Sequence, residues 1–273
     1  MPARRVVPRP VAGPRPVSTG VAALVPDDDG RRGWTLFVNG MESSHVDLDD
    51  PTRLDFEYMR WLTGAIDGMD REDEDLQILH LGGGGCTLAR CLQATHPRAR
   101  QVVVEVDAAV LELTKQAFGV RSSRALRLRV GEARTSVAAE PDASYDLVVR
   151  DAFTGSSVPE HLTTRQFVTD VARLLRPGGI YLANLADGEL LAMARREAAT
   201  AISVFAHVAL VAEPGQLHGR RYGNVVIAGS NAPLPIAPWA RRLASDPVRA
   251  RLLGNAEVRQ FASGRAPLDD ADL

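Results

Sequence analysis

Three acidic residues and a run of glycines stand directly after apolar segments, where they could do chemistry. Gly82–Gly85 follow the stretch "LHL", Glu105 ends "VVVE", Glu132 follows "LRLRVG", and Asp151 follows "YDLVVR". Short apolar runs of this kind predict buried strands. Parallel strands would bring these residues to one edge of a sheet, where open α/β sheets bind ligands. The acids could there bind hydroxyl groups or take a proton, and the glycines would let a ligand approach the backbone closely.

The glycines and Glu105 together indicate a nucleoside site. The stretch "LHLGGGGCTLAR" is an apolar strand, a glycine run and the start of a helix, and Glu105 lies about twenty residues further on, at the end of the next strand. The backbone of Gly82, Gly83 and Gly84 would approach the ligand. The Glu105 carboxylate would hold ribose hydroxyls, with Val106 beside it. Glycine runs also form ordinary tight turns, so the strand context and Glu105 decide the interpretation.

Later residues discriminate between two cofactors, because dinucleotide enzymes and S-adenosylmethionine enzymes share this first half. The stretch "VGEART" places Glu132 and Ala133 where an adenine amino group could be recognised. The stretch "LLRPGG" closes a helix with a Pro-Gly-Gly turn into a further strand. Two late apolar runs are separated by a short loop, which favours antiparallel pairing. These features favour a cofactor of the S-adenosylmethionine type.

The elements that must position these residues alternate along the chain from Leu76 onward. Such alternation predicts an α/β fold, with a mostly parallel sheet covered by helices on both faces. The late antiparallel pair makes a seven-stranded sheet whose last strand is antiparallel. The predicted strands are "LQILHL", "RQVVVEVD", "LRLRVGEA", "YDLVVRDAF", "GIYLANLA", "FAHVALVAE" and "RYGNVVIAGS", and the predicted helices are "CTLARCLQATH", "AAVLELTKQAF" and "TTRQFVTDVARLL".

The segment before this sheet divides into a tail and a small β element. Residues 1–20 are rich in proline and arginine and lack apolar periodicity, so we expect a disordered tail. In residues 21–63, an Asn-Gly pair between two short strand-like runs predicts a β-hairpin, and "PTRLDFEYMRWLTGAI" predicts a linking amphipathic helix. Residues 64–273 would form the main domain.

Composition excludes several classes of partner. The 273 residues carry a net charge of -2, which gives no basic field for nucleic acid, and no apolar run approaches a membrane span. The N-terminus has arginines but no apolar core of a signal peptide. The two cysteines, Cys86 and Cys91, fit neither a disulfide framework nor a CxxC pair, which favours the reducing cytoplasm. The stretch "HVDLDDP" has metal-ligand residue types, but acids before a proline predict a solvated strand end, so no metal is expected.

These stretches, from "LHLGGGGCTLARCL" to "YDLVVRDAFTGSSVPEHLTTRQFVTDVARLLRPGGIYLANL", resemble the spermidine synthase (polyamine aminopropyltransferase) family. The resemblance covers roughly residues 34–230. It implies a Rossmann-like methyltransferase fold preceded by a small β-domain, and a donor that is S-adenosylmethionine or its decarboxylated form, with methylthioadenosine as product or ligand. It assigns Glu105 to the ribose, Glu132 with Ala133 to adenine, and Asp151 to the attack by the substrate amine. Tyr58 matches the family's tyrosine near the reacting amine.

Four positions depart from the family pattern. The glycine loop "GGGGCT" lacks the usual acid, and Thr154 in "DAFTG" replaces the second acid after the fourth strand. Ser43 stands near the place of the family's glutamine, and Met59 follows Tyr58 instead of the frequent histidine. Desolvating the distal ammonium of a diamine without a carboxylate partner is costly. We therefore expect a retained donor site and an altered polyamine site.

The chemistry limits what the protein must supply. A sulfonium already activates its carbon, so alignment and a deprotonated nucleophile remain. Asp151 would accept a proton from an amine or hydroxyl, or orient it, with Tyr58 assisting; the alternative for Asp151 is a loop cap. His161 would lie in a lid over the site or at the surface, and Arg220 and Arg221 would bind an anionic acceptor or form a solvated turn.

Three hypotheses of different classes follow from the sequence. The first is a group transferase that passes an aminopropyl or related alkyl group to a small-molecule acceptor. The second is a small-molecule methyltransferase, and the third is a non-catalytic relative that binds adenosyl nucleosides. The retained Asp151 disfavours the third, and the lost acid at Thr154 disfavours the plain polyamine enzyme. We further expect a homodimer.

Overall fold

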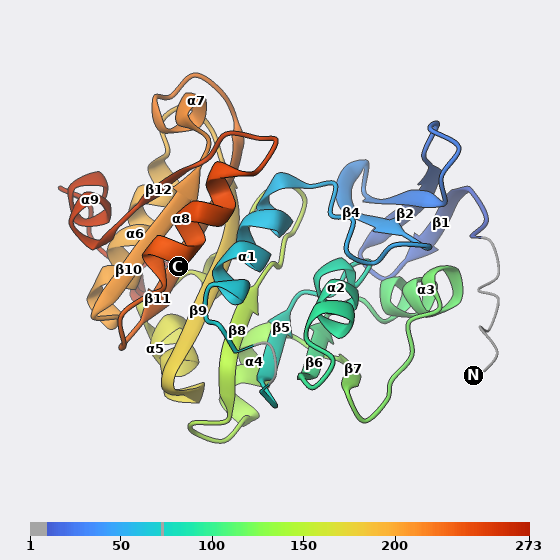
Figure 1. Ribbon diagram of the computed structural model, residues 1–273, viewed down its shortest axis with the longest axis horizontal. Helices are drawn as coiled ribbons and strands as arrows, with labels where there is room; N and C mark the ends of the chain where they lie inside the picture. The colour runs from blue at the N-terminus through green and yellow to red at the C-terminus, as the bar shows by residue number, and fades with distance from the viewer. Residues whose placement is uncertain (1–9, 72–73) are drawn as a thin grey trace.

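The computed structural model describes residues 10–71 and 74–273, which form two β-sheets (Figure 1). The smaller sheet is antiparallel, with its four strands in chain order. It precedes the main sheet in the chain and packs against the helices that follow the first two strands of that sheet. Its strands are β1 (Gly13–Val17), β2 (Gly20–Pro26), β3 (Gly33–Val38) and β4 (Met41–Asp47).

The predicted hairpin is present, and it is part of a larger sheet than expected. Asn39 and Gly40 join β3 to β4 with φ values of 52° and 78°, the left-handed pair that a tight hairpin turn requires. The disordered tail predicted for residues 1–20 is wrong from Gly13 onward, because β1 pairs with β2. Pro14 and Pro16 alternate on this edge strand, where a missing N–H faces away from the partner strand. Residues 1–9 lie outside the described part of the chain.

The main sheet confirms the predicted α/β fold and adds one strand to it. Its order is β12-β10-β11-β9-β8-β5-β6-β7. The five strands from β9 to β7 are parallel, and β10, β11 and β12 pair antiparallel, so the late antiparallel pair is confirmed. The strands are β5 (Gln77–Leu81), β6 (Arg100–Glu105), β7 (Leu126–Val130), β8 (Tyr145–Arg150), β9 (Leu175–Asp187), β10 (His207–Ala212), β11 (Gly223–Ser230) and the additional β12 (Arg251–Leu253).

Helices cover both faces of the main sheet. One apolar cluster joins α1, α2 and α8 to the sheet, and a second joins α4, α5, α6 and α9 to its other face. Helix α3 packs both against β6 and β7 of the main sheet and against the N-terminal sheet. The helices are α1 (Glu57–Asp67), α2 (Thr87–Thr95), α3 (Ala108–Phe118), α4 (Ala133–Ala139), α5 (Arg165–Leu174), α6 (Ala192–Val204), α7 (Pro214–Leu217), α8 (Ile236–Ala244) and α9 (Asn255–Phe261), with short 3-10 turns η1 (Glu160–Leu162) and η2 (Asp270–Asp272).

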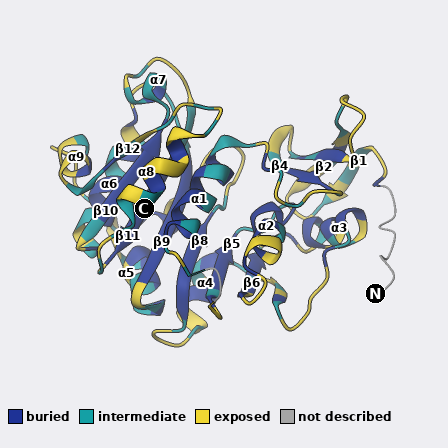
Figure 2. Cartoon of the chain, in the orientation of Figure 1, coloured by how far each residue is buried: buried dark blue, intermediate teal, exposed yellow. Residues whose placement is uncertain are grey.

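The centre of the main sheet is the core of the molecule (Figure 2). All six residues of β8 are buried, including the charged Asp146 and Arg150. A strand covered on both faces reads as a continuous apolar run. The apolar run "YDLVV" therefore predicts a strand, and the buried strand ends at Arg150, directly before Asp151.

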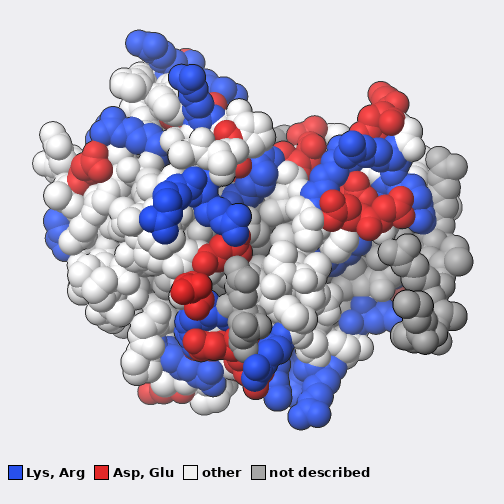
Figure 3. Space-filling model, in the orientation of Figure 1, with Lys and Arg blue, Asp and Glu red and all other residues white. Residues whose placement is uncertain are grey.

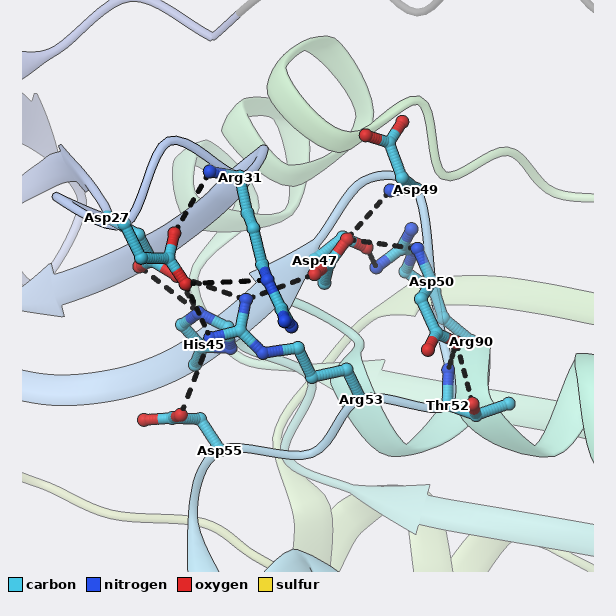
Figure 4. Close-up of polar contacts among 11 residues, drawn as sticks. Asp27, Arg31, His45, Asp47, Asp49, Asp50, Thr52, Arg53, Asp55 and Arg90 are labelled. Atoms are coloured by element: carbon cyan, nitrogen blue, oxygen red, sulfur yellow. Dashed lines mark hydrogen bonds and ion pairs between the residues drawn. The ribbon is translucent and has the colours of Figure 1, made fainter.

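A cluster of charged residues holds β4 and the segment that leads into α1 (Figure 4). Arg53 donates to Asp47 at 3.1 Å and lies 3.4 Å from Asp27. The buried His45 contacts the same Asp27 at 3.0 Å. Residues of "HVDLDDP" thus contact one another and Arg53. The segment that they hold leads directly to Tyr58.

Charge elsewhere on the surface is mixed. Acidic and basic side chains lie next to each other on the face shown in Figure 3. Exposed pairs such as Arg98 with Asp75 contribute little to stability, about 0 to 1 kcal/mol each. Within the described residues, no helix is both long and apolar enough to span a membrane.

Candidate active site

A cavity of about 810 Å³ lies at the carboxyl ends of the parallel strands, bordered by β4 and the start of α1. Its size is that of a site for a nucleoside-sized ligand together with a small acceptor. The structure brings all the predicted site residues to this one cavity. They are Tyr58, Gly82, Gly83, Gly84, Glu105, Val106, Glu132, Ala133 and Asp151.

The first two glycines allow the strand ends to approach each other. Gly82 has φ of +101°, and a Cβ there would lie 2.1 Å from the carbonyl oxygen of Asp151. A Cβ on Gly83 would lie 2.9 Å from Val103 Cγ1. Any larger side chain at either position would therefore push β5 away from β8 or β6. The glycines set the spacing that places Asp151 beside the loop.

The last two glycines, Gly84 and Gly85, allow strand β4 of the N-terminal sheet to pack closely on the glycine loop. A Cβ on Gly84 would lie 2.6 Å from Ser44 Oγ, and one on Gly85 would lie 2.9 Å from Ser44 Cβ and from Val46 Cγ2. The Gly85 amide donates to Ser44 Oγ at 2.9 Å, and Thr87 Oγ1 donates to the His45 carbonyl at 2.7 Å. The sequence suggested that the whole run serves a ligand. The structure shows that half of it lets β4 close one side of the cavity.

Glu105 organises the glycine loop. Its Oε2 accepts from the amides of Gly83 and Gly84, both at 2.9 Å, and its Oε1 accepts from the Asp107 amide at 3.0 Å. The Gly82 amide donates to the Val104 carbonyl at 2.9 Å. The loop amides are therefore engaged within the protein. A carboxylate has about four acceptor positions, so Glu105 can accept one further hydrogen bond from a ligand hydroxyl.

Glu132 caps the helix that follows β7. Its carboxylate accepts from the amides of Arg134 at 2.8 Å and Thr135 at 2.7 Å, and it contacts His161 Nε2 at 3.0 Å. Burial opposes ionisation, but these hydrogen bonds dominate and lower the pKa of Glu132 to about 2. The predicted adenine position is thus an anionic N-cap, with Ala133 beside it. His161 reaches it from η1, on the segment that borders the cavity.

Asp151 is held between a tyrosine and an asparagine. The Tyr58 hydroxyl donates to its Oδ2 at 3.1 Å, and Asn184 Nδ2 donates to its Oδ1 at 3.0 Å. Burial raises the pKa of Asp151 above its ordinary value of 3.8, against the lowering effect of these two bonds. Burial, and then the neighbouring carboxylate, raise the pKa of Tyr58 well above 10. The pair is arranged as a neutral phenol that donates to a proton acceptor.

A buried ion pair supports this arrangement from behind. Arg150, which is fully buried, donates to Glu197 Oε2 at 2.6 Å and to the Asn184 carbonyl at 3.3 Å. Removing one partner of such a pair leaves an uncompensated buried charge. The pair therefore fixes the end of β8 and the backbone of Asn184, on the two strands that carry the polar groups of the site.

Three residues of the site were not predicted from the sequence. Asn184 and Asn224 line the cavity from β9 and β11, and Glu57 lines it from the first turn of α1. Asn224 Nδ2 donates to Glu57 Oε1 at 2.9 Å, and Asn184 Nδ2 lies 3.5 Å from Asn224 Oδ1. A signal was present for Asn184, because an amide interrupts the apolar run "IYLANLA". The sequence carries no such signal for Glu57, because acidic residues are common in the first turn of a helix.

The other positions singled out in the sequence fall into two groups. Ser43, Met59 and Thr154, where the chain departs from the family pattern, all line the cavity. Arg220 and Arg221 are not among its lining residues, and Arg221 pairs with Glu213 at 2.9 Å.

The cavity is anionic. Six of its lining residues are acids, and none of the lining residues in the described ranges is Lys or Arg. An unneutralised group of acids favours positively charged ligands. The acids are Glu42, Glu57, Glu105, Asp107, Glu132 and Asp151.

Comparisons of the sequence find similar curated proteins. The chain is 33% identical over 135 residues to a polyamine aminopropyltransferase of Vibrio vulnificus, across 48% of this chain and 44% of that protein. It is 28% identical over 146 residues to the polyamine aminopropyltransferase of Chromobacterium violaceum, across 54% of this chain and 55% of that protein. These alignments thus span about half the length of both relatives.

A solved structure and a family model cover more of the chain. The crystal structure of a probable spermidine synthase from Corynebacterium glutamicum has 36% sequence identity and a TM-score of 0.90, over 96% of this chain and 97% of that one. The family model described as the spermine/spermidine synthase domain matches residues 61–214, which include Asp151 and the glycine loop. The chain therefore belongs to the spermine/spermidine synthase family.

Proposed function

We propose that this protein transfers an aminopropyl or related alkyl group from a decarboxylated S-adenosylmethionine type of donor to an amine. The observation that carries the proposal is an anionic cavity in which one acid, Asp151, accepts a hydrogen bond from Tyr58 at the carboxyl end of β8. Both substrates of such a reaction are cations. A cavity lined by six acids, with no Lys or Arg among its described lining residues, suits them.

The donor would lie against the ends of β6 and β7. Glu105 would accept from a ribose hydroxyl with its remaining lone pair, and Val106, which is 59% exposed, would cover the base. Glu132 and Ala133 would border the adenine. The same acids disfavour S-adenosylmethionine itself, because its carboxylate would find no cationic partner among the described lining residues.

The donor supplies a carbon attached to a positively charged sulfur, so that a new C–N bond forms as the C–S bond breaks and sulfur keeps the electron pair. The protein must then align the amine and remove its proton. Asp151 Oδ1 and Oδ2 accept from Asn184 and Tyr58 and keep further lone pairs for an amine N–H. The raised pKa of Asp151 makes it a better proton acceptor than an exposed carboxylate.

The acceptor site would differ from that of an ordinary polyamine enzyme. Thr154, an exposed residue on the segment after β8, stands where the family has its second acid. A hydroxyl cannot replace a carboxylate as the partner of a desolvated ammonium. Putrescine is therefore expected to be a poor acceptor.

Isothermal titration calorimetry with three nucleosides tests the donor. Decarboxylated S-adenosylmethionine and methylthioadenosine should bind, and S-adenosylmethionine should bind at least tenfold more weakly. Tighter binding of S-adenosylmethionine, together with methyl transfer from it, would favour the small-molecule methyltransferase. Binding of all three without turnover of any amine would favour the non-catalytic relative.

Three further parts of the proposal concern the whole protein. The first is a homodimer, which sedimentation equilibrium tests. The second is a cytoplasmic location, which cell fractionation tests. The third is a main domain over residues 64–273, which limited proteolysis followed by mass spectrometry tests.

A further inference from the structure

Asn184 has a buried oxygen with no hydrogen-bond partner among the described residues. Asn184 is 1% exposed and lines the cavity, and its Oδ1 accepts no hydrogen bond from residues 10–71 or 74–273. The amide orientation is fixed, because Nδ2 donates to the Asp151 carboxylate at 3.0 Å. Leaving a buried acceptor unsatisfied costs about 1 to 3 kcal/mol. An unsatisfied acceptor of this kind beside the proposed proton acceptor suits a ligand that brings a hydrogen-bond donor, such as the N–H of an amine.

Glu57 offers a negative charge on the same side of the cavity. It precedes Tyr58 in the first turn of α1, where the helix dipole favours an anion. Its Oε1 accepts from Asn224 Nδ2 at 2.9 Å, the one hydrogen bond that the described residues make to this carboxylate. Asn224 in turn lies 3.5 Å from Asn184 Nδ2. A continuous line of polar groups thus runs from Asp151 to Glu57.

Three other acids of the cavity already accept several hydrogen bonds from the protein. Glu105 holds the glycine loop, and Glu132 caps α4. Asp107 caps α3 and accepts from the backbone of Ser18 and Thr19. These three follow β6 and β7 on the donor side. Glu57 remains as the carboxylate on the acceptor side that can still take a strong charge-assisted hydrogen bond.

We infer that Glu57 determines acceptor specificity: it binds a second ammonium group of the acceptor, while Asn184 Oδ1 accepts from the attacking nitrogen beside Asp151. Glu57 thereby supplies a carboxylate from α1, at a different place from the acid that the family has at the position of Thr154, so an acceptor other than putrescine is expected. The acceptor is then a diamine or polyamine whose second charge points toward α1 and β11. This inference rests on the proposed function for its attacking amine.

Matched charge-removing variants test the inference. Glu57→Gln keeps the size of the side chain and removes its charge. Asp55→Asn removes a charge two residues away at the same helix end, at a side chain that is 56% exposed and does not line the cavity. Glu57→Asp keeps the charge. The probes are 1,3-diaminopropane, putrescine, cadaverine and spermidine, with butylamine as a monoamine that lacks the second ammonium.

Kinetics should separate a binding role from a structural one. For the best diamine or polyamine, Glu57→Gln should raise KM at least tenfold and change kcat less than threefold, while KM for butylamine stays the same. Glu57→Asp should recover part of the loss, and Asp55→Asn should behave as wild type. An equal change for butylamine and the diamine, or no change for either, would overturn the inference.

Calorimetry separates this inference from the proposed function, because it does not depend on turnover. Amines are titrated into the protein saturated with methylthioadenosine. Tighter binding of a diamine than of butylamine, lost in Glu57→Gln, supports the inference even if no group is transferred, and then the proposed function alone fails. Equal affinity of wild type and Glu57→Gln for every amine would overturn the inference even if transfer is observed.

Discussion

Tyr58 and Asp151 lie 93 residues apart in the chain, and the Tyr58 hydroxyl donates to Asp151 Oδ2 at 3.1 Å. The contact joins the start of α1 to the end of β8. Since burial and the carboxylate raise the pKa of Tyr58 well above 10, the phenol stays a donor at every physiological pH. Asp151 is thereby kept an acceptor, with its orientation fixed on two sides.

Asp151→Asn should separate catalysis from stability. Turnover should fall by roughly 100-fold, the usual range for a lost general base, while donor affinity changes little. The raised pKa of Asp151 means that its ionised form costs stability once the pH exceeds its ordinary value of 3.8. The variant should therefore be more stable than wild type at pH 7, and this advantage should vanish below pH 3.8. Urea unfolding of variant and wild type at pH 7 and below pH 3.8 measures this difference in stability.

A structural role for Asp151 would give a different result. If Asp151→Asn kept full turnover from pH 6 to 9 and lost stability, the residue would be a structural cap. Tyr58→Phe is the companion variant, because it removes one hydroxyl that is bonded to Asp151. It should lower kcat more than it raises the KM for the donor.

Glu105→Gln should weaken donor binding through two effects. The side chain keeps its size, but it loses a charge-assisted bond to a ribose hydroxyl, about 1 to 3 kcal/mol. It also replaces one oxygen by an NH₂ group, so the bonds to Gly83 and Gly84 or to Asp107 are disturbed. Calorimetry with methylthioadenosine measures the sum. Equal affinity of variant and wild type would remove Glu105 from the donor site.

Thr154→Asp should restore use of putrescine. Wild type is expected to use putrescine poorly, and an added carboxylate at this cavity position should raise kcat/KM for putrescine about tenfold or more. Thr154→Asn is the matched control, because it adds a similar volume without charge. Robust spermidine formation by wild type, unchanged in Thr154→Asp, would show that the acceptor site is not altered at this position.

His80 should make the fold sensitive to mild acid. His80 is 4% exposed and its Nε2 lies 2.8 Å from Gln101 Oε1, and burial lowers the pKa of His80 from 6.5 to about 4. The unfolded chain takes up a proton below pH 6.5 that the native state does not. Stability is therefore full above pH 6.5 and is lost as the pH falls toward 4, by about 3 kcal/mol at most.

Substitution isolates that contribution. His80→Gln should flatten the fall in unfolding free energy between pH 6.5 and 4. The control variant His218→Gln, at an exposed histidine, should leave this fall in unfolding free energy unchanged. An unchanged pH dependence in His80→Gln would assign the acid sensitivity to other groups.

The alternation of strands and helices could be predicted because most of the parallel strands contain a short apolar run, such as "VVV" in β6 and "LVV" in β8. Two kinds of element could not. Helix α6 buries residues on several sides, among them Ala198, Glu197 and Thr200, so it shows no amphipathic stripe. Strand β12 has three residues and exists through its pairing with β10, which no local pattern shows. Strand β1 was misjudged because proline indicates disorder in general but is tolerated on an edge.

Site residues that directly follow a strand could be predicted from the sequence. Site residues that depend on contacts between distant segments could not. Asp151 and Glu105 follow apolar runs, so their positions in the cavity could be inferred. The bond between Asn224 and Glu57 joins β11 to α1 across 167 residues, and no spacing rule reaches that far. Nor does the sequence show that Gly84 packs on Ser44, since a glycine that faces a ligand and one that faces a strand look alike.

The central claim is that an amine, held at Asp151, receives an aminopropyl group. The most direct measurement is mass spectrometry of reactions that contain the protein, decarboxylated S-adenosylmethionine and each of the four diamines and polyamines. The account predicts methylthioadenosine and one aminopropylated amine in equal amounts, at a rate reduced roughly 100-fold in Asp151→Asn. A methylated amine formed from S-adenosylmethionine, or no product from any amine while the donor is bound, would contradict it.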